Sequence, residues 1–508
     1  MYHCPECGGQ LRYHIETGSM KCEHCETLLP IAEAEKLSPS SAENGMKGYT
    51  YTCPNCGGSL FTVDTSAATF CSFCGSSVAL TERITHQVRP DRIIPFKITK
   101  EQCVQNFFEY LNSTPFVDTA LTKNALMESF RAIYIPFCNY RTETHGTLTG
   151  EITETRGETE YTYRAMAQLD ARNDWQLRDL SVAFPDDHCQ RINEFSRADS
   201  RPFTPAYLAG FYADVPDVSP ETYLEDVLQK NAEEAAQSFY QSVNAQPSAA
   251  QQADVEKKAL ACSCQTGQEI VFLPVWFLSV RSNDRVYYAM VNGATGRVTS
   301  DLPINKGKLF MLSCLVAAAL FIVLAFLLNL TLKPEIAVAV ASVSLVVIAC
   351  LCGRETRKCL WREGEQDRLK KGDGSATPHK SKLFSGKIRV GRLNYVHITG
   401  LAFAFVFFLW VNQLLTREYL CMVAAGASAV AMCICPSFRF KIPALLLECA
   451  GLAVLVLRLP YDLLLYGLCV VMLLMGILCE MDMIRVYHRL CSSPIPVFDT
   501  HKGGEGDA

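Results

Sequence analysis

Eight cysteines near the N-terminus are the residues whose type and spacing most clearly indicate chemistry. They form four Cys-x-x-Cys pairs, which are Cys4/Cys7, Cys22/Cys25, Cys53/Cys56 and Cys71/Cys74. Two residues between the cysteines allow both thiolates of a tight turn to face one ion, and two such turns complete a tetrahedron. Because four thiolates leave no coordination position for water, the pattern predicts two structural zinc sites with one Zn²⁺ ion each. Iron is the alternative ion for the same sulfur cage.

The two groups of four cysteines form an internal repeat. Fourteen residues separate the pairs within each group, and residues 4–11 match residues 53–60 at an offset of 49. A thioredoxin-like redox site would have a single pair at the start of a helix, which does not match four pairs in two equal repeats. His3, His14 and His24 lie nearby, but the sulfurs alone already complete the tetrahedron. We therefore expect these histidines at the surface or outside the ligand shell.

The charge of the cysteine-rich segment bears on what it binds. The whole chain has a formal net charge of −5, and residues 1–80 contain four basic against eight acidic residues. Such a surface is poorly suited to phosphate, so nucleic-acid binding is disfavoured and contact with a protein partner is the better functional interpretation. The alternative is that zinc only replaces a hydrophobic core, since a ribbon of about forty residues buries little apolar area.

The region after the ribbons has the pattern of an α+β domain with an antiparallel sheet. Ile31–Thr52, between the ribbons, is rich in Ser, Ala, Glu and Gly and reads as a linker that lets the ribbons lie independently or side by side. Ala245–Ala253 reads as a polar break. Helices are expected over Thr99–Asn112, over Thr119–Ser129 and from Ser219-Pro220 through Phe239.

The strand-like stretches of this domain contain glycines and prolines that we interpret as turns and edges. Thr144–Val182 is expected to form exposed antiparallel strands that turn at Gly146, Gly150 and Gly157. Tyr134–Phe137 and Phe272–Trp276 resemble each other and indicate two related sheet modules, whose prolines would restrict the strands to edges or bulges. Further strands are expected over Ala132–Thr142, Ala259–Val280 and Val286–Val291, with a hairpin turn over Asn292–Gly296.

The sequence contains no recognisable enzyme signature. It lacks a phosphate-binding Gly-x-x-x-x-Gly-Lys-Ser/Thr loop, a His-Glu-x-x-His pair and a Gly-x-Ser-x-Gly nucleophile motif. His145 and His188 have acidic neighbours, but a lone histidine is far more often a surface or core residue. We therefore assign no catalytic residue and no cofactor apart from zinc, and we expect that the protein is not an enzyme.

The C-terminal part is strongly apolar and is expected to form an α-helical transmembrane bundle. Nineteen basic residues lie in the loops on one side of the predicted spans and three on the other, which places both termini in the cytoplasm of a plasma-membrane protein. That side is also the reducing one, which suits free thiolates. Four spans are the alternative count to six. The six predicted spans are Leu309–Leu330, Ile336–Cys352, Tyr395–Leu415, Tyr419–Cys435, Ile442–Leu459 and Leu463–Met483.

Glu448 is the most unusual residue of the membrane part. A carboxylate about two turns inside a span is costly unless it is paired or wetted, so one interpretation is a proton or ion pathway through a transporter or channel. The alternative is a protonated or packed residue, which a single carboxyl without a second buried acid favours.

The predicted organisation is multidomain. Zinc ribbon 1 covers residues 1–30, a linker 31–52, zinc ribbon 2 residues 53–80, and a cytoplasmic α+β domain residues 90–305. Transmembrane helices 1–2 cover 309–353, a basic cytoplasmic loop 354–393, transmembrane helices 3–6 residues 394–484, and a cytoplasmic tail 485–508.

The motifs together resemble a known family. They are two Cys-Pro-x-Cys-Gly-Gly ribbons, Ile94–Phe96, Tyr134–Phe137, Leu273–Trp276, Asn292–Gly296 and Asp301–Ile304. Residues 1–330 are similar to bacterial double-zinc-ribbon membrane proteins, which are called transcription-factor-IIB-type zinc-ribbon or, loosely, primosomal helicase-like. The resemblance implies a cytoplasmic sensor or scaffold on a membrane anchor, working beside SPFH-domain and TPM-domain proteins, with the eight paired cysteines as ligands. A helicase activity would need a phosphate loop, which this sequence lacks.

The function predicted from the sequence is therefore a non-enzymatic, membrane-anchored scaffold or sensor that recruits protein partners at the cytoplasmic face. The bilayer is its other partner, and self-association into a homo-oligomer stays open. The alternatives are a transporter or channel that uses Glu448 and a membrane-tethered nucleic-acid-binding protein.

Overall fold

The computed structural model describes the N-terminal part of the chain with short gaps and selected parts of the apolar C-terminal half. The described residues are 2–37, 46–63, 71–74, 76, 81–113, 129–156, 159–184, 186–282, 285–300, 305, 307–308, 311, 315, 338, 341–351, 353–354, 426–428, 432, 441–457, 462–490 and 493–494. The helix predicted over Thr119–Ser129 falls almost entirely outside them. The turn predicted at Gly157 and the third predicted span fall entirely outside, and the first and fourth spans are described only at isolated residues.

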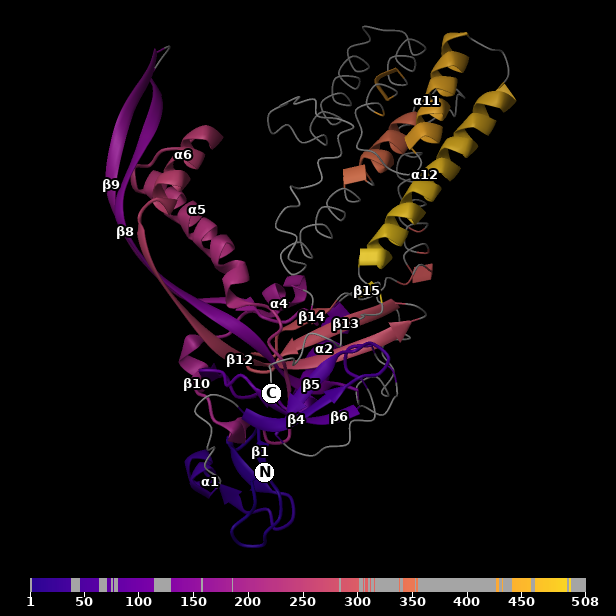
Figure 1. Cartoon of the computed structure of the whole chain (residues 1–508). Coiled ribbons are helices and arrows are strands. Elements are labelled where there is room, and N and C mark those ends of the chain that lie inside the picture. Colours follow the sequence, from indigo (N-terminus) through magenta and orange to yellow (C-terminus); the bar gives the residue numbers. More distant parts are fainter. Residues whose placement is uncertain are drawn as a thin grey trace.

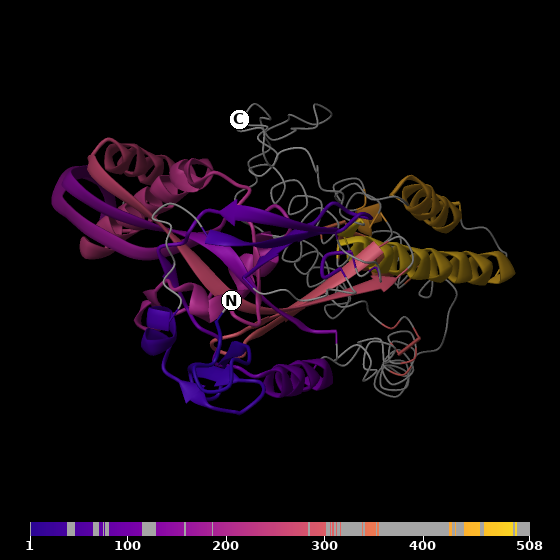
Figure 2. The same ribbon diagram turned by 60° about the horizontal axis from the view of Figure 1, so that its bottom comes forward.

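The first cysteine group lies in a small three-stranded antiparallel sheet at the N-terminus. Its strands are β1 (Leu11–His14), β2 (Ser19–Cys22) and β3 (Leu28–Leu29), and helix α1 (Ile31–Leu37) follows. The ring of Tyr13 packs edge-on against Tyr207, with 5.5 Å between ring centroids, and the Tyr13 amide donates to the Ala209 carbonyl at 3.1 Å. This unit lies away from helices α11 (Lys441–Val456) and α12 (Asp462–Leu490) in both views (Figures 1 and 2).

The second cysteine group belongs to the main sheet. Strand β4 (Met46–Thr52) pairs with β5 (Ser59–Thr62) on one side and with β6 (Thr81–Gln87) on the other, and β5 pairs with β11 (Tyr212–Asp214). The segment 31–52, which reads as a linker, therefore contains helix α1 and strand β4. Ribbon 2 is part of a 12-stranded sheet in the described part of the chain, whose order is β10-β7-β12-β8-β11-β5-β4-β6.

Two long strands, β8 (Arg131–Arg156) and β12 (Ser263–Ser282), run antiparallel through the centre of this sheet. Each changes its outer neighbour at a proline. On β8, the pairing with β11 ends at Tyr134 and the pairing with β9 (Thr159–Asp179) begins at Phe137. On β12, the pairing with β7 (Arg92–Ile93) ends at Phe272 and the pairing with β13 (Arg285–Asn292) begins at Val275. The two related modules indicated by the sequence are thus visible in the register.

The prediction that prolines restrict these strands to edges or bulges was wrong. Pro136 and Pro274 lie in central strands, at the point where one outer neighbour is replaced by the next. The carbonyl of Pro136 accepts from Leu180 N–H and that of Pro274 from Gly293 N–H, both at 2.8 Å. The N and the carbonyl of one strand residue point to the same edge, so the missing proline N–H falls in the gap between two partner strands.

Beyond this centre, β8 and β9 continue as a long two-stranded arm (Figure 1). Helices α5 (Leu224–Ser242) and α6 (Ala249–Leu260) lie along it, and α6 begins with a capping box between Ser248 and Gln251. Gly146 and Gly150, predicted as turns, lie inside β8. A Cβ at these positions would be 2.4 Å from Cys262 Sγ and 2.5 Å from Phe239 Cε1, respectively. They therefore allow the helices to approach the strand.

The other helices and short elements complete the folded N-terminal part of the chain (residues 2–300), which is called the head below. Helix α2 (Lys100–Ser113) confirms the prediction for this region, with Cys103, Phe107 and Leu111 buried. The predicted start at Pro220 is a short 3₁₀ turn (Pro220–Tyr223) that leads into α5. Helix α6 lies partly in the segment that was read as a polar break and ends before β12 begins at Ser263. The remaining elements are α4 (Asp186–Ile192), β10 (Arg201–Pro202), β14 (Val298–Ser300) and 3₁₀ turns at Arg197–Asp199 and Pro205–Leu208.

The apolar half is described chiefly by helices α11 (Lys441–Val456) and α12 (Asp462–Leu490). Among the described residues, one helix, over Leu464–His488, is long and apolar enough to cross a membrane, and the shorter apolar helices are Ala341–Leu351 and Ile442–Val454. After α12 the chain forms β15 (Ser493–Pro494), which pairs with β13 of the head.

Candidate zinc centres

The first cysteine cluster is built by two tight turns. In the first turn, the Gly8 amide donates to the Cys4 carbonyl at 2.9 Å, and the Cys4 amide donates to the Gly9 carbonyl at 2.8 Å. Gly8 has φ +73°, a conformation that glycine adopts without strain. The Gly9 amide points at Cys7 Sγ, 3.4 Å away, so the backbone supplies a donor to the sulfur.

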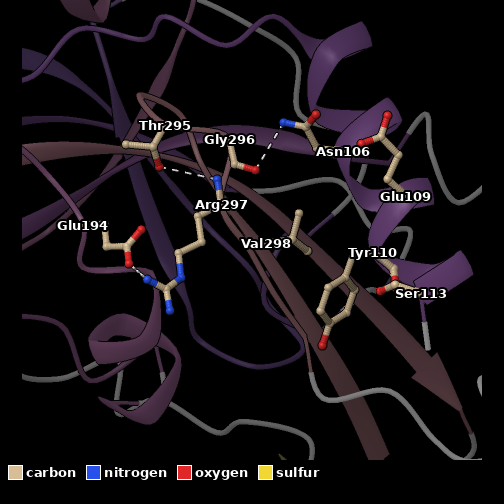
Figure 3. A pocket seen from close by; sticks show the side chains of 9 residues that line it. All are labelled: Asn106, Glu109, Tyr110, Ser113, Glu194, Thr295, Gly296, Arg297 and Val298. Atoms are coloured by element: carbon tan, nitrogen blue, oxygen red, sulfur yellow. Dashed lines mark hydrogen bonds and ion pairs between the residues drawn. The ribbon is translucent and has the colours of Figure 1, made fainter.

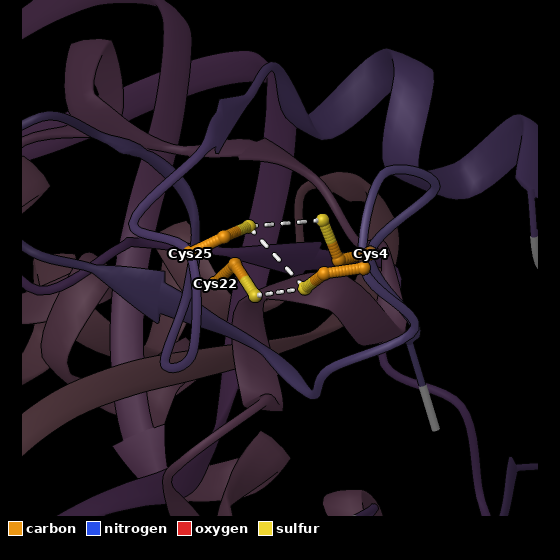
Figure 4. A group of neighbouring side chains, drawn as sticks. Cys4, Cys22 and Cys25 are labelled. Atoms are coloured by element: carbon orange, nitrogen blue, oxygen red, sulfur yellow. Dashed lines mark hydrogen bonds between the residues drawn. The ribbon is translucent and has the colours of Figure 1, made fainter.

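The four sulfurs of this cluster converge on one point (Figure 4). The distances between Sγ atoms are 3.6 Å for Cys4–Cys25, 3.4 Å for Cys7–Cys22 and 3.3 Å for Cys7–Cys25. Zinc–sulfur bonds of about 2.3 Å in a tetrahedron place the sulfurs about 3.8 Å apart. A small outward movement of the side chains therefore makes the cluster a zinc site.

The second cluster repeats this geometry. Its Sγ atoms lie 3.9 Å apart for Cys53–Cys74 and 3.7 Å apart for Cys56–Cys71, and Gly57 has φ +76°. In both clusters all four ligand atoms lie within 4.8 Å of one another. The sequence predicted these eight residues, and the structure brings them together as two groups that are compatible with zinc ribbons.

The two clusters differ in their exposure. In the first, Cys4 and Cys22 are buried but Cys7 and Cys25 are exposed, whereas all four cysteines of the second are buried. The second cluster is part of a hydrophobic core with Phe184, Phe277 and Tyr288, and the Tyr288 hydroxyl donates to the Phe73 carbonyl between two of the ligands. One site is therefore at the surface of the molecule and the other is inside it.

Polar groups next to the ligands also differ between the repeats. The hydroxyl of Thr27 lies 3.1 Å from Cys25 Sγ but donates to the Glu6 carboxylate at 2.9 Å. At the equivalent positions of ribbon 2, Ser76 Oγ lies 2.8 Å from Cys74 Sγ, and the Asn55 amide donates to the same sulfur at 3.5 Å. Sequence reasoning did not single out these four residues, although the offset of 49 already pairs them.

Hydrogen bonding between sulfurs favours thiolate formation in ribbon 2. A hydrogen bond from Cys56 lowers the pKa of Cys71 to about 5, and the same contact raises the pKa of Cys56. Cys71 is therefore the sulfur of this pair that more readily loses its proton, and the thiolate is the form that zinc binds.

His3 and His24 are chain neighbours of ligands in the first cluster, whereas His14, His145 and His188 are not. His3 and His24 are exposed, and His14 is half-buried with its Nδ1 atom 3.2 Å from the Thr17 hydroxyl. His145 forms an exposed pair with Asp170 on the arm, with 3.0 Å between Nδ1 and the carboxylate, and His188 is buried. None of them joins the groups of metal-ligating residues found in the described part of the chain.

Glu448 lies in α11, among the apolar helices. Its side chain is fully buried, and in the described part of the chain neither carboxylate oxygen has a hydrogen-bond partner that meets normal geometry. The buried Ser342 hydroxyl donates to the Met472 sulfur at 3.7 Å within the same apolar cluster. An acid held in such surroundings would bind a proton or a cation more readily than it would remain a free anion.

A hollow of about 480 Å³ opens between α2 and the hairpin that joins β13 to β14 (Figure 3). Arg297 forms an ion pair with Glu194, and the Asn106 amide donates to the Gly296 carbonyl at 3.2 Å. Its lining contains no cysteine, histidine or lysine. The hollow therefore presents amide, hydroxyl, carboxylate and guanidinium groups.

Comparison with known proteins finds a protein of similar sequence. The Uncharacterized protein YdjG of Bacillus subtilis (strain 168) is 26% identical over 316 residues, which are 60% of this chain and 91% of YdjG. No protein-family model matches the sequence. No solved structure matches it either.

Proposed function

We propose that the protein is a non-enzymatic scaffold or sensor that is anchored in the plasma membrane and recruits protein partners at the cytoplasmic face. Its two ribbons each hold one structural Zn²⁺ ion, and the apolar half is a multi-pass bundle with both termini in the cytoplasm. The observation that carries the proposal is the pair of four-cysteine clusters, one at the surface and one in the core. The membrane anchor is supported by the apolar helix over Leu464–His488.

Ribbon 1 is the docking element in this proposal. It lies at the end of the molecule away from α11 and α12, so a partner can reach it without meeting the bilayer (Figure 1). Ribbon 2 is enclosed by the main sheet and serves folding. Leu28, half exposed beside Cys25, supplies an apolar contact. A docked segment replaces water on this side chain, which favours binding.

The chemistry of the partner follows from charge. Ribbon 1 contains four glutamates against Arg12 and Lys21, both of which are paired with glutamates of the same ribbon. A filled four-thiolate zinc site adds two further negative charges. The partner segment is therefore basic with an apolar anchor, and the family resemblance implies that it belongs to an SPFH-domain or TPM-domain protein.

The test is capture of partners from crosslinked membranes by the full-length protein, with identification by mass spectrometry. Leu28→Ser removes the apolar contact without touching a zinc ligand, and Leu260→Ser, at a comparably exposed leucine on α6, is the matched control. Partners lost only with Leu28→Ser support docking on ribbon 1. An unchanged partner set in both variants would reject it.

Transport is the second candidate function, and the buried carboxyl of Glu448 favours it. In this function the acid takes up and releases a proton or a cation inside the bundle. The test is proton or sodium flux in proteoliposomes with Glu448→Gln, compared with Glu480→Gln, which changes an exposed acid of α12. Flux that Glu448→Gln alone abolishes supports transport, whereas no flux by the unaltered protein rejects it.

A further inference from the structure

The two cysteine clusters have the same donors and turn geometry but different access to solvent. Cys7 and Cys25 are exposed and their Sγ atoms are 3.3 Å apart, whereas Cys53, Cys56, Cys71 and Cys74 are all buried. A dissolved reagent can therefore touch two sulfurs of ribbon 1 in the folded protein. It can reach ribbon 2 only after the surrounding core has opened.

A difference at one repeat position adds to this contrast. Thr27 has a single hydroxyl proton, and it is directed to the Glu6 carboxylate rather than to Cys25. In ribbon 2 the residue equivalent to Glu6 is Asn55, and the residue equivalent to Thr27 is Ser76. The Asn55 amide itself donates to Cys74 Sγ, so there is no carboxylate at this position to compete for the Ser76 hydroxyl. Cys25 Sγ thus shares its neighbouring side-chain hydroxyl with a carboxylate, whereas Cys74 Sγ has two side-chain donors, and fewer side-chain donors leave a thiolate the stronger nucleophile.

We propose that ribbon 1 is a peroxide-reactive zinc–thiolate site and that Cys7 and Cys25 are its modification site, while ribbon 2 keeps its zinc. This inference rests on the zinc occupancy in the proposed function and adds a regulation to it. Oxidation of ribbon 1 then switches the docking element without unfolding the sheet.

The oxidant is hydrogen peroxide or an organic hydroperoxide. The Cys7 and Cys25 thiolates lose two electrons and form one S–S bond. The O–O bond of hydrogen peroxide breaks, and its oxygens leave as two water molecules after taking up two protons from solvent. With two of its four donors used in the disulfide, ribbon 1 no longer holds the ion.

The experiment treats the full-length, detergent-solubilised, zinc-loaded protein with hydrogen peroxide and follows released zinc with a coloured chelator. We expect one equivalent of zinc to be released at least about tenfold faster than the second, because opening of a core is required for the second. Peptide mass spectrometry should find the new disulfide between Cys7 and Cys25. Equal release rates for both ions, or first oxidation at Cys53–Cys74, would overturn the inference.

Two variants make the assignment specific. Glu6→Asn gives ribbon 1 the residue of ribbon 2 and should slow the fast phase roughly fivefold, the factor expected for one added hydrogen bond. Glu16→Asn, which alters an exposed acid in the β1–β2 turn, is the matched control and should leave the rate unchanged. Equal slowing by both variants would show a general charge effect and overturn the role of Glu6.

The outcomes also separate this inference from the proposed function. If the protein binds two zinc ions and releases both at the same rate, the two zinc ribbons are supported but the peroxide-reactive site is rejected. If elemental analysis finds no zinc in the purified protein, both the zinc ribbons of the proposed function and the peroxide-reactive site are rejected. The partner-capture experiment with Leu28→Ser tests docking on ribbon 1 and does not depend on the zinc-release result.

Discussion

At the scale of single residues, the glycines after the cysteines show how little room the zinc centres leave. Gly8 needs its positive φ, but a Cβ there would meet nothing within 4 Å. Gly9 has the opposite problem, since its Cβ would lie 3.1 Å from Cys22 Sγ and 3.2 Å from Cys7 Sγ. The first glycine is required by the backbone and the second by the packing of sulfurs.

We predict that Gly9→Ala weakens zinc binding by ribbon 1 more than Gly8→Ala does. Gly8→Ala carries only the left-handed backbone penalty of about 1–2 kcal/mol. Gly9→Ala pushes two ligand sulfurs apart, so the sulfur tetrahedron itself is distorted. Chelator competition measures the affinity of each variant, and a larger loss for Gly8→Ala would contradict the packing argument.

A second prediction at this scale concerns pH. Burial raises the pKa of the Cys138 thiol to about 11, above its ordinary value of 9.0. Between these values the unfolded chain loses this proton and the folded one keeps it, so stability is full below pH 9 and falls as pH rises toward 11. Denaturant unfolding over this range should show a shallower fall for Cys138→Ser, and identical slopes would refute the assignment.

At the scale of elements, the sequence predicted those features that depend on residues close together in the chain. The spacing of Cys103, Phe107 and Leu111 predicted α2, and Cys-x-x-Cys spacing predicted both clusters. The role of Gly150 could not be read in the same way, because it depends on Phe239, which is distant in sequence and packs against it. The Ser248–Gln251 capping box was a readable signal for α6 that the polar composition of its surroundings concealed.

We predict that Gly150→Val destabilises the arm. The Cβ would lie 2.5 Å from Phe239 Cε1 and 3.0 Å from Val255 Cγ2, so α5 and α6 would have to move away from β8. Overpacking of this kind costs about 1–3 kcal/mol. Thermal unfolding measures the loss, and Thr147→Val, at an exposed position of the same strand, is the control that should change stability little.

At the scale of the whole molecule, the two ribbons have different positions in the fold. Ribbon 1 is an attached unit held by contacts such as Tyr13 with Tyr207, whereas strands β4 and β5 make ribbon 2 a part of the main sheet. Strand β4 lies within residues 31–52 and pairs with β5 and β6, and pairing between separate segments has no signature in local spacing, which is why this stretch is predicted as a linker from the sequence.

We predict that Cys56→Ser and Cys7→Ser have unequal effects on folding. Loss of the ribbon 2 site removes zinc-binding energy from the main sheet and should lower its stability by several kcal/mol, because metal affinity of a structural site is folding energy. Loss of the ribbon 1 site should shift the denaturant unfolding transition much less, because Cys7 and Cys25 are exposed and the first cluster lies in a separate small sheet. A larger shift with Cys7→Ser would contradict this division.

The pairing of β15 with β13 limits how the apolar half can be threaded through a bilayer. Arg285 and Val286 of the head lie opposite Pro494 and Ser493, so the chain that leaves the head before residue 309 is back beside it just after α12. A path that starts and ends on the same side of a plane crosses it an even number of times. Under the proposed membrane anchor, with α12 as one crossing, an odd number of further crossings is therefore expected between Ser300 and Ser493.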